Sequence, residues 1–210
     1  MLLQHLKPCA FCPKLLDALL SGNHMDTPQG VWRHALEPSQ STQASQNLLN
    51  LDTWPSWNSS AQRVLSSVTG SLSEEQRFDL HRIERQRLVE ELWLVKAIRI
   101  GKNPDFIEIE FEWLGQQREG KTLGTALKSL RLSVTVLCEE EGGVEIAAWW
   151  RISWWAKFIR GRVNAQAKSF ATQWLNDLVT RGIGSYAESQ PFSFPVPEGE
   201  DSKTVVNDAV

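Results

Sequence analysis

The hydrophobic and polar positions of the chain alternate most regularly between residues 106 and 113, in the run FIEIEFEW. Apolar residues occupy Ile107, Ile109, Phe111 and Trp113, and acidic residues occupy Glu108, Glu110 and Glu112. A period of two predicts a β-strand whose successive side chains point to opposite faces of a sheet. One apolar face and one polar face are typical of an antiparallel sheet with one side in water.

Three further segments, residues 92–100, 130–138 and 144–154, also alternate. In the last segment one face would carry Val144, Ile146, Ala148, Trp150, Ile152 and Trp154, and the other Glu145, Ala147, Trp149, Arg151 and Ser153. The turn-forming runs GKNPD and EEEGG separate neighbouring segments. We therefore predict an antiparallel sheet of about four or more strands.

Two segments follow a helical period instead. Residues 73–92 open with Ser73 and Gln76 in a capping-box arrangement and carry a thin apolar stripe. From Trp155, apolar residues recur every three or four positions as far as Leu178, and Gly182 marks the end. This pattern predicts one helix before the sheet and a long amphipathic helix after it.

Together these elements predict an α+β fold in two layers, with the long C-terminal amphipathic helix packed on the antiparallel sheet. The order, in which a hairpin feeds a C-terminal helix, resembles the helix-grip topology of START-like lipid-binding domains over about 100 residues. The resemblance is one of topology and carries no functional residues with it. A cystatin-like topology is the alternative, and it would place the helix from Ser73 in the grip of four strands.

The sequence outside residues 71–183 lacks these regular periods. We expect residues 1–70 to form a flexible N-terminal appendage, with a short helix at 13–20 and a low-complexity linker at 38–47. Trp54 and Trp57 lie in a turn-rich stretch that could dock on the main domain. Residues 184–210 are rich in proline and acid, and we expect a disordered tail there.

Composition narrows the class of protein. Of the 210 residues 41% are hydrophobic and 22% are charged, as in a globular protein. A net charge of -3 disfavours nucleic acid as a partner. Lys7, Lys14 and Asp17 interrupt the apolar N-terminus, so we expect neither a signal peptide nor a membrane span. The three cysteines fit a reducing compartment, which makes the cytoplasm the expected location.

One string matches a nucleotide-binding motif. Residues 115–122, GQQREGKT, fit the P-loop pattern, in which Gly120, Lys121 and Thr122 would hold phosphates and magnesium. The preceding strand carries glutamates, whereas a P-loop strand is apolar on both faces. Too few residues follow for the helix of a parallel crossover. We therefore interpret the segment as a hairpin loop and keep a nucleotide-dependent enzyme as the alternative.

Other catalytic and metal-binding patterns are weaker still. Cys9 and Cys12 form a C-x-x-C pair without a preceding strand, and GIGSYA at 182–187 follows a helix where a dinucleotide site needs a strand. The strand glutamates at 108, 110 and 112 are interpreted as a charged outer face that pairs with lysine or arginine. We expect no cofactor and no metal, and the balance favours a protein that is not an enzyme.

Tryptophan is the compositional anomaly, with ten in the chain against one tyrosine. The stretch 149–162 combines an inward pair, Trp150 and Trp154, with Trp149 on the opposite face and Trp155 at the joint to the helix. Interfacial tryptophan beside lysine and arginine suits an anionic membrane surface or a protein interface. The predicted site comprises Trp149, Trp150, Arg151, Trp154, Trp155, Lys157, Phe158, Arg160 and Arg162.

We therefore predict a non-catalytic binding or accessory protein that holds an apolar ligand or a protein partner. The alternative is peripheral binding to a membrane surface through Trp155, Phe158 and the basic residues that follow. A cavity between helix and sheet would favour a ligand carrier, and a packed interior with exposed tryptophan would favour an interaction surface.

Overall fold

The computed structural model describes residues 27–84, 86–102, 105–138 and 142–183. Its strands are β1 (Gly30–Ala35), β2 (Arg63–Ser66), β3 (Arg77–Glu84), β4 (Arg87–Lys102), β5 (Asp105–Arg118), β6 (Lys121–Thr122), β7 (Leu127–Leu137) and β8 (Gly143–Ile152). Its helices are α2 (Pro38–Leu49), η1 (Leu51–Thr53), α3 (Trp54–Trp57), η2 (Trp154–Ile159), α4 (Arg160–Asp177) and η3 (Leu178–Gly182).

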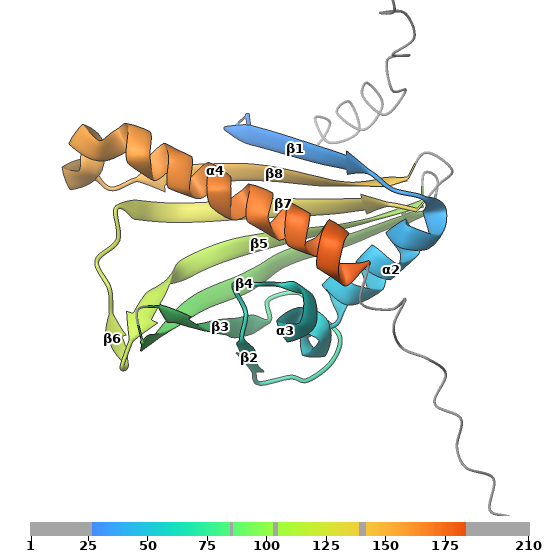
Figure 1. The fold of residues 1–210 in the computed structure, drawn as a ribbon, viewed down its shortest axis with the longest axis horizontal. Helices are drawn as coiled ribbons and strands as arrows, with labels where there is room; N and C mark the ends of the chain where they lie inside the picture. Colours follow the sequence, from blue (N-terminus) through green and yellow to red (C-terminus); the bar gives the residue numbers. More distant parts are fainter. Residues whose placement is uncertain (1–26, 85, 103–104, 139–141, 184–210) are drawn as a thin grey trace, which may run out of the picture.

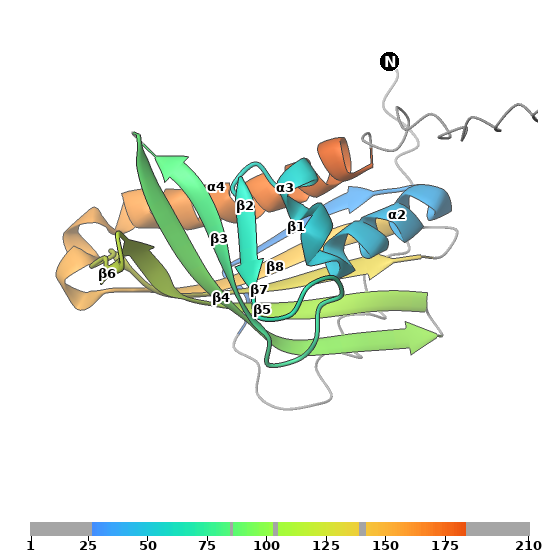
Figure 2. The same cartoon turned by 90° about the horizontal axis from the view of Figure 1, so that it is seen from below.

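The strands form a single antiparallel sheet in the order β1-β8-β7-β5-β4-β3-β2, with β6 paired to β5. The helix α4 lies across one side of this sheet, and α2 and α3 cover the same side further along (Figure 1). Figure 2 shows the sheet curving around them. The predicted fold class, a long C-terminal helix packed on an antiparallel sheet in the helix-grip arrangement, is confirmed.

Irregular pairing between β4 and β5 contributes to the curvature of the sheet. Their register shifts at two places, between Leu92 and Trp93 and between Val95 and Ala97. Extra residues of this kind bend a strand and increase its twist. Gly115, opposite Leu92, has φ 143°, a backbone conformation that residues with a side chain rarely adopt.

Most of the tryptophan excess belongs to the hydrophobic core. Six of the ten tryptophans are less than 9% exposed, namely Trp54, Trp57, Trp93, Trp113, Trp150 and Trp174. Trp174 of α4 contacts Trp54 and Trp93, with ring centroids 5.2 Å apart in both pairs. Burial of large aromatic side chains therefore joins α3, α4 and the sheet in one core.

The predicted helix over residues 73–92 is wrong. Ser73 and Gln76 do make the capping interaction, with Ser73 N–H donating to Gln76 Oε1 at 2.8 Å. The chain then turns at Glu75, with φ 58°, and continues into β3 and β4. Alternate residues such as Phe78 and Leu80 are buried, so the strand period prevails over the local cap. The cystatin-like alternative depended on this helix and fails with it.

The expected flexible linker at 38–47 is also wrong. These residues belong to α2, where the side chain of Gln40 accepts from the backbone N–H of Glu37 at 3.0 Å as half of a capping box. Ala44 and Leu48 are fully buried, and small polar residues such as Ser41 are buried with them. Because β1, α2, α3 and β2 all precede residue 71, the folded unit extends well into the expected appendage. The predicted helix at 13–20 and the tail from 184 lie outside the described residues.

Candidate ligand cavity between α4 and the sheet

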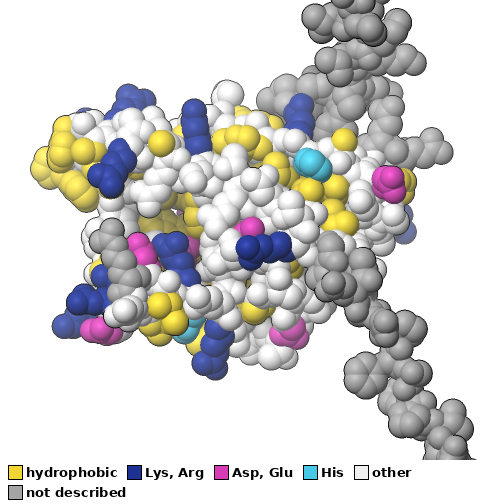
Figure 3. All heavy atoms as spheres, in the orientation of Figure 1, with side chains coloured by type: hydrophobic (Ala, Val, Ile, Leu, Met, Phe, Trp, Pro, Cys, Tyr) yellow, Lys and Arg dark blue, Asp and Glu magenta, His cyan; other side chains and the backbone are white. Residues whose placement is uncertain are grey.

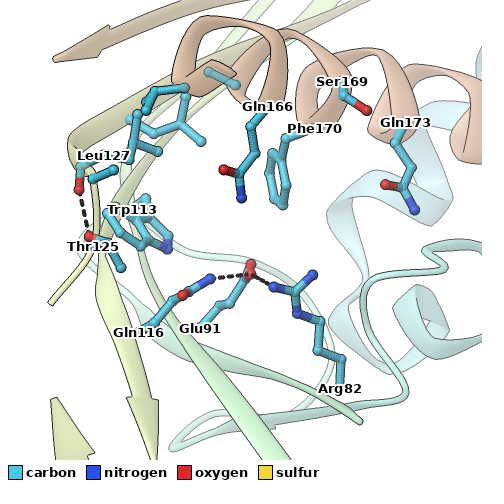
Figure 4. Close-up of a pocket in the computed structure, with 14 residues that line it drawn as sticks. Arg82, Glu91, Trp113, Gln116, Thr125, Leu127, Gln166, Ser169, Phe170 and Gln173 are labelled. Carbon is cyan, nitrogen blue, oxygen red and sulfur yellow. Dashed lines mark hydrogen bonds and ion pairs between the residues drawn. The ribbon is translucent and has the colours of Figure 1, made fainter. Parts of the chain in front are cut away.

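A cavity of about 350 Å³ lies between α4 and the sheet (Figure 4). Its walls come from β3, β4, β5, the start of β7 with the segment that leads into it, and one face of α4. Small-molecule sites in proteins occupy about 300 to 1,000 Å³, so this volume suits a small ligand.

Short side chains leave this space open. Ala167 of α4 is 2% exposed and faces the sheet across the cavity, and Ala126 lines it where the chain enters β7. Larger side chains close the ends, because Val163 and Phe170 flank Ala167 on the same face of α4. The curvature of the sheet and the alanines on the helix together make the cavity.

One wall of the cavity is aromatic. Trp113 of β5 and Phe170 of α4 both line it, and Figure 4 shows Trp113 at the left and Phe170 near the centre, above Glu91. Phe170 is held by Trp93 of β4, on which it stacks with ring centroids 5.7 Å apart and planes 14° from parallel. A flat apolar molecule would find stacking surfaces on these rings.

The opposite wall carries a buried carboxylate, Glu91 of β4, which is 2% exposed. Its Oε1 lies 3.1 Å from Nη2 of Arg82 and accepts a hydrogen bond from Nε2 of Gln116 at 3.0 Å. The sheet register explains this cluster. On β5, Gln116 pairs directly with Glu91. On β3, Leu80 pairs with Glu91, and Arg82 is two residues further along, so its side chain lies on the same face of the sheet. Figure 4 shows the carboxylate pointing into the cavity between Gln116 and Arg82.

The second oxygen of Glu91, Oε2, is buried and accepts no hydrogen bond from the described residues. The indole N–H of Trp93 lies near this carboxylate and lowers its pKa, yet Trp93 Nε1 makes no hydrogen bond of normal geometry with any described residue. Burial is the largest influence and raises the pKa of Glu91 above its usual 4.5, against the opposing effect of Arg82.

Polar side chains of α4 form the rim of the cavity. Gln166, Ser169 and Gln173 line it and are exposed to solvent. Gln173 donates from Nε2 to the hydroxyl of Ser59 at 2.6 Å, which ties the helix to the segment between α3 and β2. The cavity is thus apolar and aromatic on one side, charged at Glu91 and Arg82, and polar at its mouth.

The site predicted from sequence lies elsewhere, around η2. Trp154 and Phe158 are 80% and 83% exposed, and Trp155 is 44% exposed. Arg151, Lys157, Arg160 and Arg162 are exposed around them. Figure 3 shows hydrophobic side chains beside lysine and arginine at the end of the molecule where α4 begins. We call Trp154, Trp155, Phe158, Lys157, Arg160 and Arg162 the η2 surface.

Two predicted tryptophans are separate from that surface. Trp150 is buried, as predicted, and its Nε1 donates to Oδ1 of Asn164 at 2.9 Å. Trp149 is half-buried beneath the guanidinium of Arg131, 4.3 Å from the ring centroid. The predicted inward position of Trp154 is wrong, because β8 ends at Ile152 and η2 turns this side chain outward.

The nine residues predicted as a site are all described, and none of them lines the cavity. Sequence reasoning missed Arg82, Glu91 and Gln116, although a signal exists in β4. The buried positions Val89, Glu91, Trp93 and Val95 alternate, and Glu91 is the acidic member of an otherwise apolar face. The predicted helix over residues 73–92 hid this pattern, because a helix groups residues with a period of 3.6 and a strand groups them with a period of two.

The P-loop-like string forms a hairpin, as interpreted. Gln117 pairs with Thr122 and Arg118 with Lys121, and the turn uses Glu119 and Gly120 with φ 53° and 72°. The strand β7 follows directly where a P-loop would need a helix. Gly120 therefore belongs to a tight turn, and Lys121 and Thr122 belong to the strand that follows it.

Two of the three strand glutamates, Glu108 and Glu110, pair with arginine, as predicted. Arg99 lies 3.1 Å from Glu108 and 2.8 Å from Glu110, and Ser133 donates to Glu108 at 2.8 Å. Both glutamates are buried under these partners, where the sequence predicted solvated side chains. Within the described residues no helix is long and apolar enough to cross a membrane.

Comparison with solved structures finds the same fold in other proteins. A hypothetical protein from Helicobacter pylori superposes with a TM-score of 0.51 at 13% identity, covering 76% of this chain and 98% of that protein. Major latex-like protein 151 from Panax ginseng gives 0.48 at 12% identity, over 75% of this chain and 94% of that one. A protein from Thermus thermophilus gives 0.47 at 10% identity, over 74% and 99%. No protein-family model matches the chain, and no curated protein matches it.

Proposed function

We propose that this protein is a non-catalytic binding protein that holds a small, largely apolar molecule in the cavity between α4 and the sheet. The observation that carries the proposal is the cavity of about 350 Å³ between α4 and the sheet, which opens to solvent at its polar rim. A cleft of this size with aromatic walls and a few polar groups is typical of a small-molecule site.

The chemistry of the lining supports binding over catalysis. A carboxylate of raised pKa, such as Glu91, is also found in general acids and bases. Catalysis by acid and base needs a second group in reach, and the described residues that line the cavity include no histidine, lysine, cysteine or tyrosine. The hydroxyl of Thr125 is occupied, because it donates to the carbonyl of Leu127 at 2.6 Å.

A cavity-filling variant tests the proposal. Ala167→Trp places an indole in the cavity, and we expect binding of the neutral dye N-phenyl-1-naphthylamine, followed by its fluorescence, to weaken at least about tenfold. Ala165→Trp, on the exposed side of α4, is the matched control and keeps the affinity of the unmodified protein. Equal dye binding by both variants, with thermal unfolding showing both folded, would contradict the proposal.

Extraction identifies the natural ligand directly. Protein purified under native conditions, then denatured and extracted, should release a small molecule that mass spectrometry detects in the unmodified protein and Ala165→Trp but not in Ala167→Trp. The same molecule recovered equally from all three proteins would place it outside the cavity.

The exposed η2 surface supports a second function, attachment to an anionic membrane surface. Trp154 and Phe158 keep 80% and 83% of their surface in water, and large side chains seldom do so without a partner. Lys157, Arg160 and Arg162 beside them make no ion pair with any described residue. Aromatic side chains that enter the headgroup region beside cations that meet anionic lipid are typical of interfacial binding.

Vesicle co-sedimentation tests this second function. We expect binding to phosphatidylserine-containing vesicles at low salt, weaker binding to phosphatidylcholine alone, and loss in the double variant Trp154→Ala, Phe158→Ala. Ile100→Ala removes an apolar side chain of comparable exposure, 67%, from β4 and should not change binding. Absence of binding to either vesicle would favour a protein partner for the η2 surface.

A further inference from the structure

The polar end of the cavity restricts the chemistry of its ligand. Glu91 is 2% exposed, its Oε2 accepts no hydrogen bond from the described residues, and Figure 4 shows the carboxylate aimed into the open space. Leaving a buried acceptor without a hydrogen bond is unfavourable, and more so for a charged group. A ligand that donates a hydrogen bond to Oε2 recovers that energy.

The neighbours of Glu91 decide which donor fits. Arg82 Nη2 at 3.1 Å balances the negative charge, and Gln116 satisfies the same oxygen, Oε1. A ligand carboxylate would place another negative charge beside Glu91 and Glu84, which already share Arg82, and a ligand ammonium would have to lose its hydration next to the Arg82 guanidinium. A neutral hydroxyl or N–H group meets neither penalty.

We infer that the ligand is a neutral amphipathic molecule whose flat apolar body lies between Trp113 and Phe170 and whose hydroxyl or N–H group donates to Oε2 of Glu91. This inference rests on the proposed ligand cavity and adds the class of molecule that it selects. Phe170, braced by its stacking on Trp93, supplies the apolar side, and Glu91 supplies the polar anchor.

Two matched compounds test the hydrogen bond. 2-Naphthalenemethanol carries a hydroxyl donor, and its methyl ether has the same ring and oxygen but no donor. We measure the affinity of each by titration calorimetry at several pH values up to well above neutral, because burial raises the pKa of Glu91 and the ionised carboxylate is the acceptor. We expect the unmodified protein to prefer the alcohol by about tenfold or more, the effect of one hydrogen bond to a charged group.

Glu91→Gln isolates the contribution of the carboxylate. The amide oxygen can keep the contacts with Arg82 and Gln116, while the amide N–H₂ presents a donor where Oε2 was an acceptor. We expect the preference for the alcohol to fall to about twofold or less. Glu84→Gln is the matched control, because Glu84 also pairs with Arg82, at 3.7 Å, but does not line the cavity. It keeps the preference of the unmodified protein.

The outcomes separate the inference from the proposed function. Equal affinities for alcohol and ether in the unmodified protein, with both lost in Ala167→Trp, would overturn the hydrogen bond and leave the ligand cavity standing. Failure of either compound to bind the unmodified protein would overturn both. The comparison of alcohol with ether uses the unmodified protein, so it tests the proposed hydrogen bond even where Glu91→Gln unfolds.

Discussion

Two tryptophans show how differently the same residue type acts at different places. Trp174 is 1% exposed at the centre of the aromatic cluster, and Trp154 is 80% exposed on η2. We expect Trp174→Ala to lower the free energy of unfolding by about 3 to 5 kcal/mol, because it leaves a large cavity. Trp154→Ala should change it by less than about 0.5 kcal/mol. Urea unfolding followed by circular dichroism measures both, and equal losses would mean that η2 packs against the fold.

Glu91 also predicts a dependence of stability on pH. Burial raises its pKa above 4.5, so the folded protein holds a proton that the unfolded chain has already released. The free energy of unfolding therefore falls as pH rises from about 4.5 through the raised pKa. Arg82, Gln116 and Trp93 oppose the shift by favouring the ionised form, and the negative charge of Glu84 adds to it.

A comparison of variants separates this dependence from that of other carboxyls. Glu91→Gln has no proton to release, so its stability should decline less between pH 4.5 and 8 than that of the unmodified protein. Glu84→Gln removes only the smallest of these influences on the pKa of Glu91, so it should keep most of the original slope. Chemical unfolding at several pH values gives the slopes, and parallel curves for all three proteins would show that Glu91 titrates alike in the folded and unfolded states.

At the scale of elements, Gly115 is the residue at which β5 bends. Its φ of 143° disfavours any side chain, although a Cβ added there would meet no atom within 4 Å. We expect Gly115→Ala to cost about 1 kcal/mol or more from backbone conformation alone. Gly124→Ala has equal space and no such φ, and should be neutral or slightly stabilising. Thermal unfolding compares them, and equal midpoints would show that the bend tolerates a side chain.

Some elements were predicted correctly because their apolar residues follow a single period, of two for a strand or of three to four for a helix. Ile107, Ile109 and Phe111 face the core through β5, and α4 follows its three-and-four spacing. The helix predicted over residues 73–92 is wrong because a real capping interaction at Ser73 favours a helix, while charged residues interrupt the strand period beyond it. One of those charged residues is Glu91. Because this segment was predicted as a helix, Glu91 was not recognised as a residue on the buried face of a strand.

The prediction from composition was wrong at α2, because a few packed residues are enough to order a polar helix. Its polar run of serine and glutamine predicts disorder, yet one face of the helix needs only Ala44 and Leu48 to pack, and small serines pack beside them. The η2 surface could be found from sequence because aromatic and basic residues are adjacent along the chain. The cavity joins residues from Arg82 to Gln173, and only the tertiary structure brings those together.

At the scale of the whole molecule, the segment before residue 71 completes the core. Trp54 and Trp57 are 0% and 1% exposed, Trp54 contacts Trp174, and Trp54 Nε1 donates to the carbonyl of Leu48 at 3.1 Å. The strand β1 covers the edge of β8, and β2 covers the edge of β3. Removing this segment would expose both the aromatic cluster and two strand edges.

We therefore expect a chain that begins at residue 71 to lack cooperative unfolding and to aggregate, whereas one that begins at residue 27 keeps every described element and unfolds in a single transition. Differential scanning calorimetry and near-ultraviolet circular dichroism distinguish the two. The near-ultraviolet circular dichroism signal should respond more strongly than the calorimetric transition to loss of the segment, because Trp54, Trp93 and Trp174 pack in one cluster. A cooperative transition in the shorter chain would mean that the sheet folds without its flanking helices, and that the segment before residue 71 is an addition to the fold after all.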